Sequence, residues 1–224
     1  MPSKYITILA GHFEQPLADL VATLSACKRD TEFPSIPTSR EIDYSIVSTV
    51  LLVMMFESYV SRIRYFDKSS KNRRDVLSYL ALIPGFHAQH RRLLEVYILR
   101  DAIAHNHVLE FEQKWKEDSA PYNTNFQLDR SWQAWTKKYG QRVKLRKRKP
   151  PITKLLKLNV MPTQICKDDV RVVFREIHES LKRLDKLGKL DLSIENLHVR
   201  YISKKNGQEV KHLSFPFWNL IDEI

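Results

Sequence analysis

The chain has 224 residues, enough for one sizeable core with an appendage or for two small domains. Hydrophobic residues make up 43% and charged residues 28%, an ordinary composition for a soluble protein, and the net charge is +11. The two cysteines, Cys27 and Cys166, are too few for a disulfide framework, so we expect free thiols in a reducing compartment. No apolar leader opens the chain and the most apolar run, Val50 to Phe56, is far shorter than the ~20 residues that cross a bilayer, so we expect a cytoplasmic protein with no membrane partner.

The first predicted helix covers 14–29, where apolar residues recur at helical spacing before Pro34 interrupts the pattern. Thr38 and Glu41 then have the spacing of a capping box, in which a hydroxyl and a carboxylate satisfy the free amides at a helix start. The predicted helix over 40–66 is apolar on nearly every side in its middle, which indicates a central helix buried by its neighbours.

A shorter helix is expected over 72–83, ended by Pro84-Gly85. The next helical pattern begins at Leu93 and continues to Phe111, either as one long helix or as two helices joined near Arg100. A loop is expected over 117–127.

A basic strip follows this loop. From Ser131 to Lys167 there are 11 Lys and Arg and no Asp or Glu. A short amphipathic helix is predicted at the start of this segment, around Trp132, Trp135 and Tyr139. Such a strip favours a polyanion through counterion release, and the alternative is a solvated loop without a function. The centre of the strip, which we expect to bind substrate, is Lys144, Arg146, Lys147, Arg148 and Lys149.

The last third of the chain predicts one helix and one hairpin. An apolar stripe from Val170 to Leu184 indicates a helix over 167–187, and Gly188 can end it. Asn206-Gly207 between two β-compatible runs is the strongest short-range signal for a β-hairpin.

Together these patterns predict an all-α fold of four to five core helices with a small C-terminal β-hairpin, and strand confined mainly to the last ~30 residues. The expected organisation is an N-terminal helix and loop over 1–37, a helical domain over 38–190 with a basic insertion over about 131–167, and a C-terminal tail over 191–224.

The run Leu99-Arg100-Asp101-Ala102-Ile103-Ala104-His105-Asn106-His107 contains the most chemistry. An imidazole that moves a proton near neutral pH and a guanidinium that binds a phosphate are a minimal set for cutting RNA. The spacing by itself is weak evidence, because with 17 Arg and 8 His an arginine followed by a histidine five to seven residues later is expected roughly twice by chance. Arg171 and His178 form such a pair in an ordinary amphipathic helix.

In its context the run resembles the HEPN superfamily of all-helical ribonuclease and nucleotide-binding domains. The family pattern is an arginine, a polar residue, a short gap and a histidine, which Arg100, Asp101 and His105 fill, and the trailing Asn106 is similar as well. Glu57 matches loosely a place where the family often carries an acidic residue. The resemblance covers about residues 40–190.

The resemblance implies metal-independent cleavage without a cofactor, in which the RNA 2′-hydroxyl attacks the adjacent phosphate and leaves a 2′,3′-cyclic phosphate and a 5′-hydroxyl. His105 would be the acid–base catalyst and Arg100 would neutralise the phosphate oxygens, while Asp101 would orient His105 or hold the partner's Arg100. Asn106 and His107 would help to bind RNA. A toxin or defence role is implied too, with an inhibitor or sensor protein as a regulatory partner.

Geometry constrains this site. Residues five apart on an α-helix lie about 140° apart around the axis, so Arg100 and His105 cannot share a face of one regular helix. Either a helix begins or kinks near Arg100, or two copies of the chain form one site across a two-fold axis. HEPN proteins are known for such composite sites, so we expect a homodimer.

Several alternatives stay open. Arg100 and Asp101 could form a surface pair beside partly buried histidines, in a non-catalytic HEPN-like module that binds RNA or a nucleotide or scaffolds a partner. The chain could also be an unrelated helical protein whose basic strip binds nucleic acid or an acidic protein. His107 stands where one HEPN lineage carries a tyrosine, which argues against that lineage. Zinc is not expected, because the four histidines concerned lack metal-ligand spacing: His87, His90, His105 and His107.

Overall fold

The computed structural model describes residues 11–29, 36–67, 75–105, 109–114, 123–128, 142–146, 149–189, 196–205 and 208–224. Its α-helices are α1 (Gly11–Ser25), α2 (Ser39–Phe66), α3 (Val76–Leu80), α4 (His87–His105) and α6 (Lys167–Lys186). Strands β1 (Leu109–Lys114) and β2 (Asn123–Leu128), β3 (Val143–Arg146) and β4 (Lys149–Thr153), and β5 (His198–Lys205) and β6 (Gln208–Pro216) pair as separate antiparallel sheets. The short helices η4 (Pro162–Gln164) and η6 (Phe217–Glu223) complete the order.

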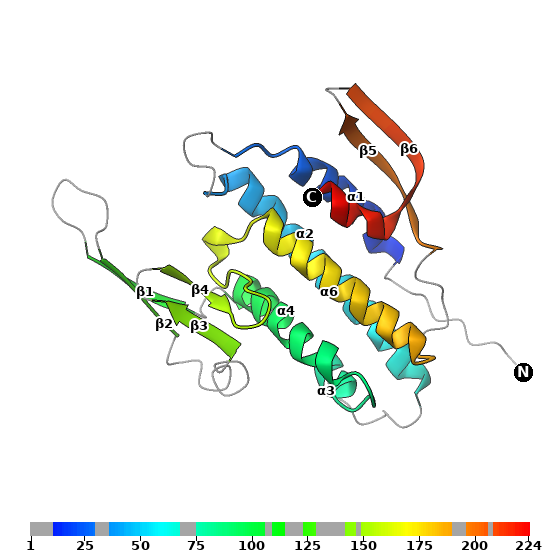
Figure 1. The fold of residues 1–224 in the computed structure, drawn as a ribbon, viewed down its shortest axis with the longest axis horizontal. Coiled ribbons are helices and arrows are strands. Elements are labelled where there is room, and N and C mark those ends of the chain that lie inside the picture. Colours follow the sequence, from blue (N-terminus) through cyan, green and yellow to red (C-terminus); the bar gives the residue numbers. More distant parts are fainter. Residues whose placement is uncertain are drawn as a thin grey trace, which may run out of the picture.

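Helix α2 lies at the centre, in contact with α1, α4 and α6 (Figure 1). Helices α2 and α6 run in the same direction and α4 runs against both of them. By length and composition α2 is the one helix among the described residues that could cross a membrane, but half of its most apolar window is buried by its neighbours. A core helix has this composition too, and the prediction of a long central helix over 40–66 is confirmed.

The start of α2 joins three helices. Thr38 accepts a hydrogen bond from the Glu41 amide at 3.2 Å, as the sequence predicts, but the Glu41 carboxylate turns away from the cap. It accepts from Arg29 Nη2 at 2.7 Å, beyond the end of α1, and from the Lys167 amide at 3.2 Å, at the start of α6. Although burial opposes its ionisation, these donors outweigh burial and lower the pKa of Glu41.

Helix α4 is buried on every side along one stretch. The residues from Leu93 to Leu99 are all buried, because α2, α6 and the loop that follows β4 surround them. The helix ends at His105 and the chain continues as β1, so the expected helical continuation to Phe111 is wrong. The sequence from Leu109 to Glu112 alternates apolar and acidic residues, which is the period of a strand and not of a helix.

Helix α6 matches the sequence-based expectation. Its apolar stripe is buried, and Gly188 has φ +64°, the left-handed conformation that ends a helix. Phe174 packs against Phe217 and Trp218, with ring centroids 5.3 and 5.5 Å away, so η6 closes the core beside α6. Across the bundle, the buried Glu176 binds the guanidinium of Arg92 from α4.

The predicted C-terminal hairpin is confirmed as β5 and β6, although its turn at Asn206-Gly207 lies outside the described residues. The hairpin covers α1: the Gln15 side chain donates to the Arg200 carbonyl at 2.9 Å and accepts from the Arg200 amide at 3.0 Å. Residues from α1, α2, α4, α6 and η6 belong to one hydrophobic core.

Helices dominate the core, as expected, but strand is not confined to the last ~30 residues. Strand β2 lies where a loop was expected over 117–127, and β3 and β4 form inside the basic strip. Helix α3 is shorter than the predicted 72–83. The helix expected around Trp132, Trp135 and Tyr139 lies outside the described residues.

Candidate functional site

Arg100 lies near the end of α4, on the turn where this helix emerges from the core. Its Nη2 is 3.5 Å from the Glu57 carboxylate of α2, and its Cζ is 5.1 Å from the centroid of the Tyr97 ring. Arg100 and Glu57 are each about one-third exposed, at 31% and 32%. The central helices α2 and α4 therefore hold one guanidinium between them at the protein surface.

Asp101 is the second acid beside Arg100. Its Oδ1 lies 2.9 Å from Arg100 Nε, but that N–H is not directed at the oxygen, so the contact is electrostatic and not a hydrogen bond. With Glu57 and Asp101 ionised, the Glu57–Arg100–Asp101 cluster has a charge of −1. Within one chain the cluster orients the arginine without offering a net positive charge to a phosphate.

His105 is the last residue of α4, which runs without interruption from His87. The helix therefore neither begins nor breaks at Arg100, so the single-chain arrangement, in which a helix start or kink near Arg100 brings it to His105, is wrong. The arrangement across a two-fold axis stays a prediction. The five-residue separation places the two backbones about 140° apart around the axis and about 7.5 Å apart along it. The structure describes the backbone of His105, and Asn106 and His107 lie outside the described residues.

The basic strip forms an antiparallel hairpin in its middle. Lys144 of β3 and Lys149 of β4 are exposed, Arg146 lies in β3, and Lys147 and Arg148 lie outside the described residues. The described residues from 142 to 157 carry six Lys and Arg and no acid. The strip is thus an ordered cationic surface over the part that the structure describes.

Glu95 anchors this hairpin to α4. Its buried carboxylate accepts hydrogen bonds from the Leu155 amide at 2.9 Å and from the Leu156 amide at 2.8 Å, in the loop after β4. Burial and then the nearby Arg142 lower the pKa of His90 one turn earlier on α4. The basic hairpin therefore lies along the same helix that ends with Arg100, Asp101 and His105.

Sequence reasoning missed the role of Glu95. The signal that could have found it is a single acid inside the otherwise apolar run Leu93 to Leu99, since a buried carboxylate needs donors.

Sequence reasoning also missed an exposed apolar face on α2, where Val47 and Met54 are each 45% exposed. These two residues lie seven apart, so they share a face of the helix, and Glu57 follows Met54 by less than one turn.

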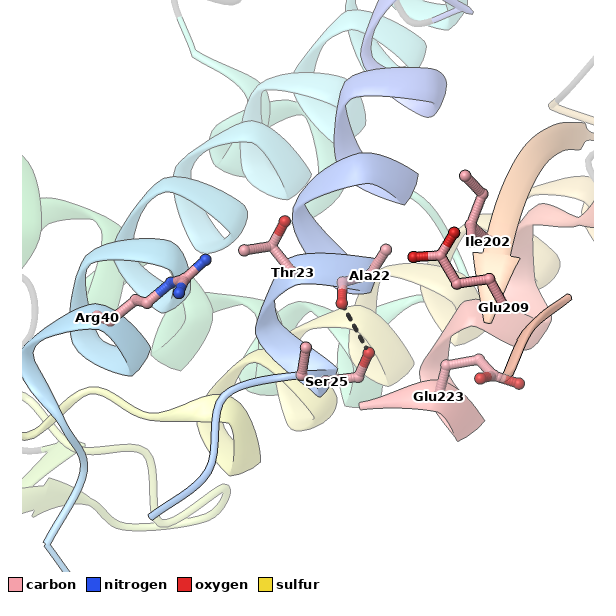
Figure 2. Close-up of a pocket in the computed structure, with 8 residues that line it drawn as sticks. Ala22, Thr23, Ser25, Arg40, Ile202, Glu209 and Glu223 are labelled. Carbon is pink, nitrogen blue, oxygen red and sulfur yellow. Dashed lines mark hydrogen bonds between the residues drawn. The ribbon is translucent and has the colours of Figure 1, made fainter. Parts of the chain in front are cut away.

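A pocket of about 460 Å³ lies elsewhere, between α1, the first turn of α2 and the C-terminal hairpin (Figure 2). None of the residues of the Glu57–Arg100–Asp101 cluster lines it. Sequence reasoning gave no sign of this pocket, because its walls come from three segments that are far apart in the chain. Its lining residues are Ala22, Thr23, Ser25, Ala26, Arg40, Ile202, Glu209 and Glu223.

The thiols and histidines suggest no further chemistry. Cys27 is buried, and burial together with the neighbouring Asp169 raises the pKa of the Cys166 thiol to about 11, which disfavours the reactive thiolate. Within the described ranges no three His, Cys, Asp or Glu side chains are grouped so that they could hold a metal ion.

Comparison of this chain with models of known protein families, with curated proteins and with solved structures finds no match.

Proposed function

We propose that this chain is a HEPN-like, metal-independent endoribonuclease that acts as a homodimer. The observation that supports this most is the placement of Arg100 between Glu57 and Asp101 on the two central helices, five residues before His105. An arginine held at the surface by acids from two helices suits a site that must orient a guanidinium, since a bare surface arginine samples many rotamers.

In the proposed reaction His105 takes the proton from the RNA 2′-hydroxyl and returns a proton to the departing 5′-oxygen. The 2′-oxygen forms a bond to the adjacent phosphorus while the bond to the 5′-oxygen breaks, which leaves a 2′,3′-cyclic phosphate and a 5′-hydroxyl. Arg100 stabilises the charge that develops on the non-bridging oxygens. Because the nucleophile is the 2′-hydroxyl, DNA is not a substrate.

The geometry of α4 favours a dimer over a monomer for this role. Arg100 and His105 lie about 140° apart around one continuous helix, whereas a shared cleft would bring the partner subunit's Arg100 and the partner subunit's His105 to the same phosphate. The exposed Val47 and Met54 of α2 lie within one to three turns of Glu57 and offer an apolar surface for such self-association. A two-fold pairing over this face brings both clusters to one interface.

In this proposal the basic hairpin holds the RNA backbone. Lys144 and Lys149 are exposed on the hairpin that Glu95 attaches to α4, so phosphates bound there would continue toward the end of the same helix. A toxin or defence setting, with an inhibitor or sensor protein as the regulator, belongs to the same proposal.

One observation favours a second candidate, a non-catalytic HEPN-like module that binds RNA or a nucleotide or scaffolds a partner. Glu57 and Asp101 neutralise the charge of Arg100 within one chain, as they would in a structural cluster. The two candidates differ in whether His105 is needed for an activity.

The test is incubation of the purified protein with labelled RNA in excess chelator. Wild type is expected to cut the RNA, and His105→Ala is expected to lose cleavage while RNA affinity changes little. His12→Ala, on α1, is the matched control and should cut like wild type. If wild type binds RNA without cutting it, or if His105→Ala cuts as fast as wild type, the nuclease proposal is rejected in favour of the binding module.

A further inference from the structure

The pocket between α1, α2 and the C-terminal hairpin has a size suited to a small molecule. Its volume of about 460 Å³ falls within the range of about 300–1,000 Å³ that is typical of small-molecule sites. Helix α1 forms its floor with Thr23 and Ser25, Arg40 stands on the side of α2, and Glu209 extends from the hairpin on the opposite side (Figure 2).

Opposite charges face this pocket without neutralising each other. The Arg40 guanidinium lies 5.7 Å from the Tyr44 ring centroid, and no hydrogen bond or ion pair joins Arg40 or Glu209 to another side chain in the described part of the chain. Glu223 adds a second carboxylate, held by a hydrogen bond from the Tyr201 hydroxyl at 3.4 Å. One guanidinium and two carboxylates give the pocket a charge of −1, on a protein whose net charge is +11.

The two hydroxyls on the floor, of Thr23 and Ser25, add acceptors and not donors. Ser25 Oγ gives its proton to the Ala22 carbonyl at 3.1 Å (Figure 2). Thr23 Oγ1 gives its proton to the Asp19 carbonyl at 3.0 Å, so what it can offer to a ligand is its oxygen lone pairs. The pocket therefore presents acceptors from these hydroxyls, Glu209 and Glu223, and one strong donor group from Arg40. This set matches a ligand with one carboxylate and more than one cationic donor, and it disfavours the polyanionic backbone of RNA.

We propose that this pocket binds a basic α-amino acid, arginine or lysine, either free or as the last residue of a peptide. The α-carboxylate lies against the Arg40 guanidinium, and the cationic groups of the ligand lie against Glu209 and Glu223. The site is independent of the proposed RNA cleavage, since it shares no residue with the Glu57–Arg100–Asp101 cluster.

The test is calorimetric titration of the full chain with L-arginine, L-lysine, a tripeptide ending in arginine, and agmatine, which is arginine without its carboxylate. Wild type should bind at least one of the first three saturably and bind agmatine about tenfold or more weakly. Binding of the free amino acid but not of the tripeptide would identify a free ligand, and binding of both would identify a carboxyl-terminal residue.

Two exposed-residue variants separate the two ends of the ligand. Arg40→Gln should weaken the carboxylate-bearing probes about tenfold and leave agmatine unchanged, whereas Glu209→Gln should weaken every probe. Arg91→Gln and Glu179→Gln remove exposed charges from α4 and α6 and should bind like wild type, and circular dichroism checks that each variant is folded. No saturable binding up to about 10 mM of any probe, agmatine binding as tightly as L-arginine, or unchanged binding by both pocket variants would overturn the proposal.

Discussion

At the scale of single residues, the arrangement around Arg100 depends on a contact that the sequence does not encode locally. Glu57 and Arg100 are 43 residues apart and meet because α2 packs against α4, which brings the two side chains into an ion pair at 3.5 Å. The sequence singled out both residues, but not this contact between them.

Replacing Glu57 should separate function from stability. The pair with Arg100 is about one-third exposed on both sides, so Glu57→Gln should change the free energy of unfolding by less than about 1 kcal/mol. If Glu57 orients Arg100 for catalysis, the same variant should lower kcat for RNA cleavage about tenfold, because a freed guanidinium samples other rotamers. Glu179→Gln is the matched control, and equal kcat values for Glu57→Gln and wild type would contradict this role.

Gly85 allows a test of the backbone at the turn before α4. It has φ +78°, and a Cβ there would lie 3.1 Å from Nη2 of Arg183, whose Nε donates to the Gly85 carbonyl at 3.2 Å. Gly85→Ala should therefore lower the free energy of unfolding by about 1.5 kcal/mol, as measured by urea denaturation.

Two other glycines separate the causes of that loss. Gly188 has φ +64° but nothing within 4 Å of a Cβ. Gly188→Ala should therefore lower the free energy of unfolding only by the cost of the left-handed backbone, about 1 kcal/mol. Gly11, in α1, has nothing within 4 Å either, and Gly11→Ala should be neutral or slightly stabilising. Equal stabilities for Gly85→Ala and Gly11→Ala would contradict the account of this turn.

At the scale of elements, strong and regular signals led to correct predictions. The stripe of α6, the Thr38 cap of α2 and the Asn206-Gly207 hairpin each depend on residues close together in sequence, where propensity and hydrogen bonding act locally. Strands β1 to β4 were missed because each is only four to six residues long. Even in β1 the alternation covers just the four residues from Leu109 to Glu112, and the helical pattern that precedes it outweighed so short a signal. Pairing with a neighbouring strand decides their conformation, and that pairing is not visible in either strand by itself.

The basic hairpin should bind RNA without acting on it. Its centre contains Lys and Arg but no His, Asp or Glu that could act as an acid–base catalyst. Replacing these Lys and Arg by Gln should therefore weaken RNA affinity and flatten the salt dependence by about 0.7 per lost phosphate contact, while kcat at saturating RNA is kept. The variant replaces Lys144, Arg146, Lys147, Arg148 and Lys149.

A charge-matched control distinguishes this surface from the positive charge of the whole protein. Replacing five exposed cations outside the hairpin by Gln, three Lys and two Arg as in the hairpin variant, should change affinity and salt slope much less. The control residues are Lys28, Arg91, Arg175, Lys186 and Lys211. If the hairpin variant and the control variant bind RNA with the same affinity and the same slope, the hairpin is a solvated surface without a role in binding.

At the scale of the whole molecule, the account depends on self-association over α2. The exposed Val47 and Met54 should lie in the interface, so Met54→Arg places a charge there and should convert the dimer into a monomer of 26.5 kDa, as measured by sedimentation equilibrium. Cleavage should fall with dimer content, while helix content by circular dichroism stays the same because Met54 is exposed. Leu82→Arg, at another exposed apolar position, should leave the dimer intact. A wild-type protein that is monomeric at the concentrations where it cuts RNA would contradict the composite site.

In the proposed reaction His105 and Arg100 direct attack by the RNA 2′-hydroxyl, and the chemistry of the product ends shows whether this attack occurs. In excess chelator, a labelled RNA should yield fragments that end in a 2′,3′-cyclic phosphate and begin with a 5′-hydroxyl, and a single 2′-deoxy substitution should block cleavage at that one position. The account predicts that His105→Ala and Arg100→Ala each lose these products. Fragments with a 3′-hydroxyl and a 5′-phosphate, or cleavage that passes the 2′-deoxy position unchanged, would contradict it.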